Sequence, residues 1–168
     1  ETIMMILRHN EVPDVTTLIE RARRKLNDAY IQSKNEAAWA AKPSRSTMLY
    51  DMYYNGNLNR EEVAIYQERL HIIFENFLNS YTVQQLRQNR EFIDLQQAEE
   101  FRTIKLNDIT VYLVMDILYK DRRTDQWVIV DWKTGKSTAD DRQQLALYAY
   151  YVHKTLRVPL EQIEVRNE

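Results

Sequence analysis

The stretch Val111–Lys133 decides the fold and reads VYLVMDILYKDRRTDQWVIVDWK. Both of its ends are rich in β-branched, aromatic and aliphatic residues, and its middle is polar, which predicts two strands joined by a turn. Each apolar run is interrupted by a single aspartate. If the turn is centred between Arg123 and Thr124, Tyr119 pairs with Val128 across the hairpin.

The same register places Asp116 directly opposite Asp131, with their Cβ atoms about 5 Å apart. Side chains alternate along a strand, so Lys133 emerges beside both carboxylates. Two crowded carboxylates repel each other unless one is protonated or a cation lies between them. Mg²⁺ or Mn²⁺ fits this role, because hard cations prefer oxygen ligands and often combine carboxylates with phosphate and water. Lys133 can supply a positive charge that binds a phosphate. If its surroundings lower the pKa of Lys133, it can instead hold and deprotonate an attacking water. The pattern Asp131-x-Lys133 by itself is also typical of a strand end that is simply exposed to solvent.

Composition restricts the class of protein. The chain has 168 residues, which suits one domain of ordinary size, and its 44% hydrophobic and 29% charged residues describe a soluble globular protein. It has no cysteine, which excludes disulfides, thiolate zinc sites and cysteine-held iron–sulfur clusters and is compatible with a reducing compartment. The net charge of −2 indicates no general affinity for nucleic acid, so such binding depends on a local basic patch or a metal.

No apolar run approaches the roughly 20 residues that span a bilayer, so we expect a cytoplasmic protein without a membrane partner. The opening Thr2–His9 lacks the pattern of a signal peptide. The sequence starts at Glu1 without a methionine, and we therefore expect a fragment of a longer protein.

The first part of the chain reads as helices. Asp14 is an expected N-cap, and a second long amphipathic helix is expected to end near Asn79. We expect an N-terminal helical region at 1–80 and a core at 81–168, within a single compact domain overall. The arginines and lysine at 21–25 can meet phosphates or simply be solvated. Tyrosines at 50–54 can stack on bases or pack together.

His71 lies at the edge of the second long helix's apolar face. Imidazole binds several divalent ions, so His71 is a candidate metal ligand. The competing interpretation is a half-buried structural histidine, because no other residue near it in the sequence has a ligand spacing.

A strand over Glu99–Leu106 precedes the hairpin, so three antiparallel strands follow one another. Asp140 or Asp141 is expected to cap a helix that ends near Leu156. On that helix Gln144 and Tyr148 are four apart and share a face. Either the backbone at the rim of the core satisfies their hydrogen bonds, or both side chains face Asp116 and Asp131.

Taken in order, these motifs resemble the PD-(D/E)XK nuclease superfamily. Asp116, the hairpin, the VDWKTG strand end at 130–135 and the Gln-x-x-x-Tyr helix are most similar to its RecB-type branch, over roughly Glu99–Leu156. The resemblance implies an α/β (α+β) fold with a restriction-endonuclease-like core. Its mixed sheet has three successive antiparallel strands, flanking helices and a further strand from about Ile163.

The resemblance also implies a site. Asp116 and Asp131 would bind Mg²⁺ or Mn²⁺, the Trp132 carbonyl would add a ligand, and Lys133 would assist the attacking water. Gln144 and Tyr148 would shape the site for the DNA strand.

Two features depart from the family pattern. A glycine is common three positions before the first aspartate, where this chain has Leu113, and no Gly-x-x-x-His supplies the usual upstream histidine. The expected activity is that of a Mg²⁺- or Mn²⁺-dependent deoxyribonuclease, exonuclease or endonuclease, in DNA repair, recombination or defence. The alternative is a non-catalytic binding or assembly module, and either can work with other domains or subunits of a larger complex.

Overall fold

The computed structural model describes residues 2–135 and 139–168. The chain divides into two compact units, unit 1 (Glu1–Glu11 with Asn79–Glu168) and unit 2 (Val12–Leu78). The described elements of the chain are, in order, α1 (Thr2–His9), α2 (Val15–Ser33), α3 (Glu36–Ala41), η1 (Pro43–Arg45), α4 (Tyr50–Asn55), α5 (Arg60–Asn79), α6 (Tyr81–Gln88), η2 (Arg90–Phe92), β1 (Ile93–Leu106), β2 (Ile109–Asp121), β3 (Gln126–Asp131), α7 (Ala139–Leu156), η3 (Leu160–Gln162) and β4 (Ile163–Asn167).

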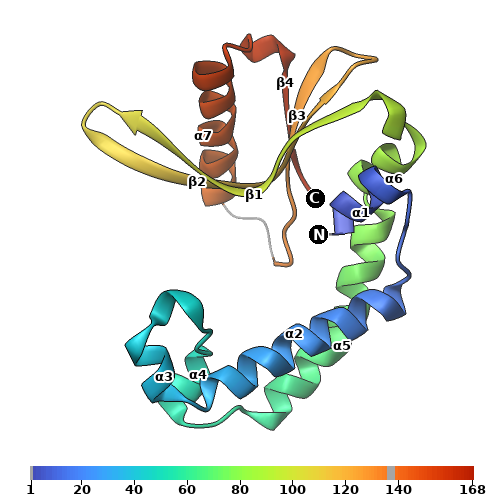
Figure 1. Cartoon of the computed structure of the whole chain (residues 1–168). Helices are drawn as coiled ribbons and strands as arrows, with labels where there is room; N and C mark the ends of the chain where they lie inside the picture. Colours follow the sequence, from blue (N-terminus) through green and yellow to red (C-terminus); the bar gives the residue numbers. More distant parts are fainter. Residues whose placement is uncertain (1, 136–138) are drawn as a thin grey trace. The chain divides into compact units, whose positions relative to one another are not determined.

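Unit 1 is built on a four-stranded mixed sheet in the order β1-β2-β3-β4 (Figure 1). The first three strands are antiparallel neighbours, and β4 runs parallel to β3. The hairpin has the predicted register, with Tyr119 paired to Val128. This sheet and its helices confirm the predicted restriction-endonuclease-like α/β fold.

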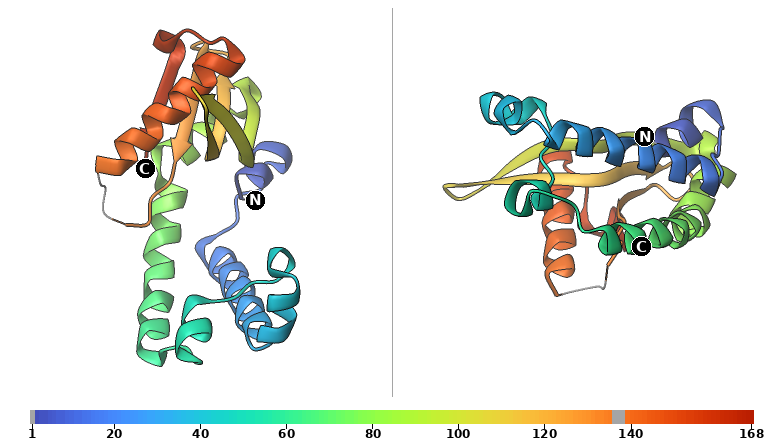
Figure 2. Two further views of the ribbon diagram at one scale, coloured as in Figure 1. Left: turned by 90° about the vertical axis from the view of Figure 1, so that its left-hand side faces the viewer. Right: turned by 90° about the horizontal axis from the view of Figure 1, so that it is seen from below.

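Helix α7 packs on the sheet and forms the main core. Figure 2 shows α7 and α1 on opposite sides of the strands, and α1 packs against α6. Burial of large apolar side chains at about 25 cal/mol per Å² is the main force that holds these layers. The core cluster under α7 consists of Ile104, Leu113, Met115, Leu118, Ile129, Leu145, Tyr148, Tyr151, Val152 and Val158.

Strand β2 departs from strict alternation at Asp116. Met115 and Leu118 belong to the same core cluster, although residues three apart in a regular strand point to opposite faces. Across β1, Glu99 adopts a left-handed backbone with φ 49°, between the paired positions Ala98–Ile117 and Glu100–Met115. The irregularity of both strands therefore lies at Asp116, the first of the two aspartates predicted to bind metal.

Polar contacts fix both ends of the sheet. At the hairpin turn, Asp121 accepts hydrogen bonds from the backbone and guanidinium of Arg123, at 2.6–3.1 Å. At the other end, buried Thr82 at the start of α6 donates its amide and hydroxyl to the Glu168 carboxylate. Arg166 of β4 donates to the Tyr119 hydroxyl at 3.0 Å, and burial raises the pKa of that hydroxyl to about 12.

Unit 2 is entirely helical. The predicted cap is present, since Asp14 accepts a hydrogen bond from the Thr17 amide at 2.7 Å. Buried Ser33 accepts a hydrogen bond from the Leu49 amide at 2.8 Å, which fixes the chain before α4. The tyrosines at 50–54 pack on one another at centroid distances of 4.5–4.8 Å, in tilted and edge-to-face arrangements.

Three expectations differ from the structure. Strand β1 begins at Ile93 rather than near Glu99, and the segment before it contains α6, which was not expected. Helix α7 begins at Ala139, so Asp140 and Asp141 lie in its first turn, and the cap position falls outside the described residues. Residues 1–11, expected with the N-terminal helices, group with unit 1. The division at residue 80 stays a prediction.

Candidate active site

Asp116 lies one position beyond the last paired residues of the hairpin, Ile117 and Val130. Its Oδ2 accepts a hydrogen bond from the Trp132 amide at 2.7 Å, which ties β2 to the chain just after β3. Burial raises the pKa of Asp116, the Trp132 amide opposes that rise, and the negative charges of Asp131 and Glu99 add to it. The side chain is therefore an acid whose charge is poorly solvated and close to a second acid.

Asp131 ends β3 and is 4% exposed. Its Oδ2 lies 2.5 Å from Nζ of Lys133, a close ion pair. Among the described residues, no donor other than this ammonium reaches that buried oxygen. The ion pair with Asp131 raises the pKa of Lys133, and Asp141 contributes to the same rise. Lys133 is therefore a cation at neutral pH in this arrangement.

The predicted helix pair contacts Lys133 directly. The Lys133 Nζ donates to Oε1 of Gln144 at 2.8 Å, and Nε2 of Gln144 donates to the Tyr148 hydroxyl at 2.7 Å. That hydroxyl donates to the Val114 carbonyl at 2.5 Å. This chain of hydrogen bonds links β3, α7 and β2, and it holds the ammonium group of Lys133 beside Asp131.

Backbone contacts position the segment that carries the site. The amide of Lys133 donates to the Glu168 carbonyl at 2.7 Å, and the Glu168 amide donates to the Asp131 carbonyl at 3.2 Å. The indole of Trp132 donates to the Ser80 hydroxyl at 3.4 Å. The chain therefore remains fixed for two residues after β3 ends, and the side chains of Asp131 and Lys133 are both held.

These residues fit a hard divalent metal. Burial and the Asp131 charge disfavour the negative charge of Asp116, so two acids here gain from a cation beyond the single ammonium of Lys133. Asp116 supplies the second carboxylate, and oxygen donors suit Mg²⁺ or Mn²⁺. Within the described ranges, no group of three or more histidine, cysteine, aspartate or glutamate side chains gathers in a way that could hold a metal. Substrate phosphate and water would therefore complete the coordination.

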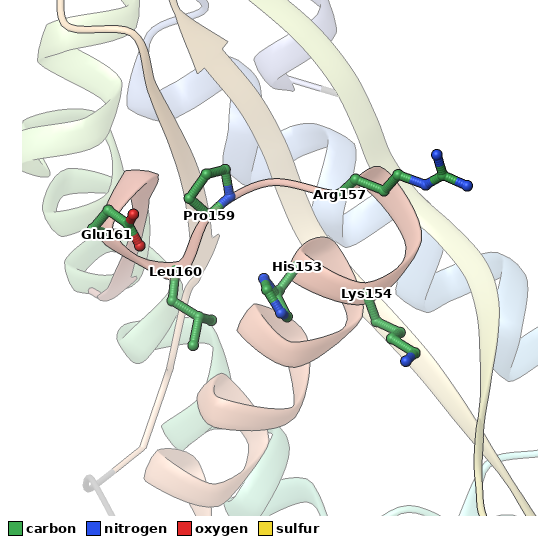
Figure 3. A pocket seen from close by; sticks show the side chains of 6 residues that line it. All are labelled: His153, Lys154, Arg157, Pro159, Leu160 and Glu161. Atoms are coloured by element: carbon green, nitrogen blue, oxygen red, sulfur yellow. The ribbon is translucent and has the colours of Figure 1, made fainter.

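One described pocket of unit 1 is formed by residues other than these acids, and His71 belongs to the other unit of the chain. His71 is in unit 2, and its Nε2 lies 3.5 Å from Glu75 on an exposed face of α5, so its role as a ligand stays a prediction. A pocket of about 540 Å³ lies beyond the last turn of α7 (Figure 3). Its histidine, His153, has its ring Nδ1 2.8 Å from the Val158 carbonyl. In Figure 3 the Arg157 side chain points away from the other lining residues, so the basic groups do not converge on an anion.

Two acids near the site were not singled out from the sequence. Asp141 lies 3.8 Å from Lys133 Nζ, where it was expected only as a helix cap. Glu99 acts electrostatically on Asp116, where it was expected only as a strand residue. A signal for Asp141 was present, since it stands one turn before Gln144 on the same helix.

The comparison with protein families agrees with this geometry. The model of the PD-(D/E)XK nuclease superfamily matches residues 9–166. The chain belongs to the PD-(D/E)XK nuclease superfamily. Members of this superfamily are generally nucleases that use divalent metals such as Mg²⁺, and their substrate is nucleic acid. No curated protein matches the sequence. In the part of this superfamily member that the structure describes, no helix is both long and apolar enough to cross a membrane.

Proposed function

We propose that this chain is a metal-dependent deoxyribonuclease of the RecB-type branch, acting in DNA repair, recombination or defence. The observation that carries the proposal is the pairing of two acids with one fixed cation: the charge of Asp131 acts on half-buried Asp116, and Lys133 forms a 2.5 Å ion pair with Asp131. A purely structural ion pair needs only Asp131 and Lys133, and a second acid whose pKa is raised by burial and by the Asp131 charge would only weaken it. A site that binds a divalent cation and a phosphate explains why the two acids occur together.

Asp116 and Asp131 would hold Mg²⁺ or Mn²⁺, together with the Trp132 carbonyl. When bound, the metal polarises the phosphate and lowers the pKa of a coordinated water. The hydrogen bond from the Trp132 amide to Asp116 keeps that carboxylate turned toward the end of β3.

Lys133 contributes a fixed positive charge. Because its ion pair with Asp131 raises its pKa, Lys133 is better suited to orient the water and stabilise the developing phosphate charge than to remove a proton. The hydrogen bonds through Gln144 to Tyr148 hold the ammonium in place. This positioning adds to the proposed role of both residues in shaping the DNA-strand site.

The test is cleavage of linear and plasmid DNA by the full chain with Mn²⁺, with EDTA as the blank. Asp131→Asn should abolish cleavage and the stabilisation of the fold by Mn²⁺, because the amide is a poor ligand for a hard cation. A purified chain that gains stability from Mn²⁺ and binds DNA but cuts neither substrate would favour the non-catalytic module. A chain that neither binds Mn²⁺ nor cuts would contradict the metal site itself.

A further inference from the structure

Strands β1 and β2 continue beyond the rest of the sheet as a two-stranded ribbon. Strand β3 pairs with β2 only from Ile117 to Asp121, so residues 109–116 of β2 pair with β1 alone. Figure 1 shows this hairpin projecting from the sheet. One face of the ribbon belongs to the core under α7, through Ile104 and Leu113. We call the other face of the ribbon the outer face; it carries Phe101, Thr103, Lys105, Thr110, Tyr112 and Val114.

The outer face consists of three cross-strand pairs whose six side chains are all exposed. Two of the six are aromatic and very open, with Phe101 76% and Tyr112 71% exposed. They are diagonal neighbours, which places their Cα atoms about 7–8 Å apart. Open apolar side chains gathered in one patch indicate a binding surface rather than ordinary solvent exposure. The pairs are Phe101 with Val114, Thr103 with Tyr112, and Lys105 with Thr110.

The chemistry of this outer face suits one kind of ligand. It offers two rings, one of them a phenol, together with two threonine hydroxyls and one ammonium group, and its six side chains include no carboxylate, although the chain as a whole has a net charge of −2. Rings stack on nucleobases of any sequence, and hydroxyls and lysine bind phosphates. A nucleic-acid strand therefore matches both the apolar and the charged parts of the surface.

The outer face is close to the candidate active site along strand β2. Val114 carries one of the exposed side chains, and its carbonyl accepts the hydrogen bond from Tyr148. Asp116 follows two residues later, about 7 Å along the strand, and Tyr112 is about 13 Å from Asp116 by the same rise per residue. A strand that leaves the acids and follows β2 would pass over these rings.

We infer that the outer face of the β1–β2 ribbon binds unpaired bases of the substrate strand, with Phe101 and Tyr112 as stacking platforms and Lys105 on a phosphate. This inference rests on the proposed nuclease function and names its substrate class as single-stranded nucleic acid or a single-stranded end. Paired bases in a duplex hide their faces from side chains, whereas unpaired bases can stack on an open ring.

The experiment measures binding of the full chain to fluorescein-labelled oligo(dT) and to a blunt hairpin duplex by anisotropy, in EDTA so that neither probe is cut. The double variant Phe101→Ala, Tyr112→Ala should lose on the order of tenfold in oligo(dT) affinity for each ring and little affinity for the duplex. Tyr112→Phe should keep wild-type affinity, because the ring and not the hydroxyl stacks. Ile109→Ala is the matched control, since Ile109 is 68% exposed on the same ribbon but outside the outer face.

Three results would overturn the inference. Unchanged oligo(dT) binding by the double variant would show that the strand lies elsewhere. A double variant that melts at lower temperature with unchanged binding would indicate that the face packs on another part of the chain, and a change of sedimentation from dimer to monomer would indicate a second copy. These outcomes can be told apart from the nuclease proposal. If the double variant loses oligo(dT) affinity but the wild-type chain never cuts DNA, the stacking platform is supported and the nuclease is not. If wild type and the double variant cut duplex DNA equally and bind oligo(dT) equally, the nuclease is supported and the platform is not.

Discussion

Lys133 contacts two carboxylates and one amide, and these contacts define its chemistry. Its ammonium lies 2.5 Å from Asp131 and 3.8 Å from Asp141, and Gln144 accepts its hydrogen bond. A lysine that acts as a base needs surroundings that lower its pKa, such as burial or a nearby cation. Here the surroundings are anionic, which favours a permanent charge at this position.

Replacing Lys133 should therefore separate rate from metal binding. We expect Lys133→Met to reduce Mn²⁺-dependent cleavage by on the order of a hundredfold or more, because it removes charge from the transition state. The variant should melt lower than wild type in EDTA, because Asp131 loses its cation, and Mn²⁺ should restore much of that loss. The exposed Lys154→Met, at the far end of α7, is the control. Equal cleavage by both variants would contradict the role of Lys133.

Asp116 provides a prediction about stability in the absence of metal. Burial raises its pKa, so its negative charge destabilises the fold at neutral pH, and Asp116→Asn should melt at the wild-type temperature or higher in EDTA. The asparagine oxygen can still accept the Trp132 hydrogen bond. As the pH falls through the raised pKa the gap should close, because a protonated carboxyl carries no such penalty.

Metal should reverse this order. At a Mn²⁺ concentration about 100 times Kd, binding stabilises the native state by about 2.7 kcal/mol, or about 5–10 °C for a chain of this size. We expect wild type to show this shift in thermal melts and Asp116→Asn to lose most of it. An equal shift in both proteins would exclude Asp116 as a ligand.

At the scale of elements, α7 is tied to the ribbon by one hydroxyl. Tyr148 accepts from Gln144 and donates to the Val114 carbonyl, and it is 3% exposed. Because both hydrogen bonds are partly buried, removal of the hydroxyl leaves two polar groups without this partner. The same contact positions Gln144, and through it Lys133.

We expect Tyr148→Phe to cost about 1–3 kcal/mol of stability and to reduce cleavage by less than Lys133→Met does. Tyr150→Phe is the matched control, since Tyr150 is 40% exposed on the same helix. Urea melts and cleavage rates measured on both variants check the prediction. A Tyr148→Phe protein that cuts as poorly as Lys133→Met would instead place the hydroxyl on the substrate.

The sequence predicts the hairpin well and its neighbours less well. Polar residues between two apolar runs determine the register of β2 and β3, because a slip of one residue would invert both faces. The start of β1 was missed because a register shift between Leu95 and Gln97 breaks the alternation. Helix α6 was missed because its short sequence is mostly polar, and its burial comes from tertiary contacts of Thr82, Val83 and Leu86.

The candidate active site shows the same difference between what the hairpin pattern predicts and what tertiary contacts decide. The hairpin register predicts that Asp116 and Asp131 lie near each other, although Asp116 is one position beyond the paired residues. Lys133 follows the end of β3, where a hydrogen bond to Glu168 and not strand pairing holds the chain. The influence of Glu99 on Asp116 depends on a left-handed residue inside β1, which no alternation pattern reports. The contact of Asp141 with Lys133 depends on where α7 begins relative to β3, and this is a three-dimensional property.

At the scale of the whole molecule, every residue of the candidate active site except His71 belongs to unit 1. A ligand stabilises only the structure that binds it, so Mn²⁺ should raise the unfolding temperature of unit 1 and leave that of unit 2 nearly unchanged. Trp127 and Trp132 are in unit 1, and Trp39 is in unit 2. Replacement of Trp39 therefore leaves tryptophan fluorescence that reports on unit 1 alone.

In Trp39→Phe, we expect the fluorescence transition to shift with Mn²⁺ by more than the helical signal in circular dichroism, to which unit 2 contributes strongly. The same pair of measurements on Asp131→Asn should show no shift in either signal. Equal shifts of both signals in Trp39→Phe would mean that the two units unfold together, or that His71 binds the metal.

The ribbon also sets how the molecule exchanges its amide protons. Residues 117–121 of β2 have a partner strand on both sides, but residues 109–116 have one on a single side, and local opening is easier where fewer hydrogen bonds must break. Deuterium uptake should therefore rise abruptly at Asp116. A small ion held by the acids would slow uptake only near that boundary, whereas a ligand lying along the strand would slow it toward Ile109. The distance over which uptake slows thus measures how far a bound molecule extends from the metal.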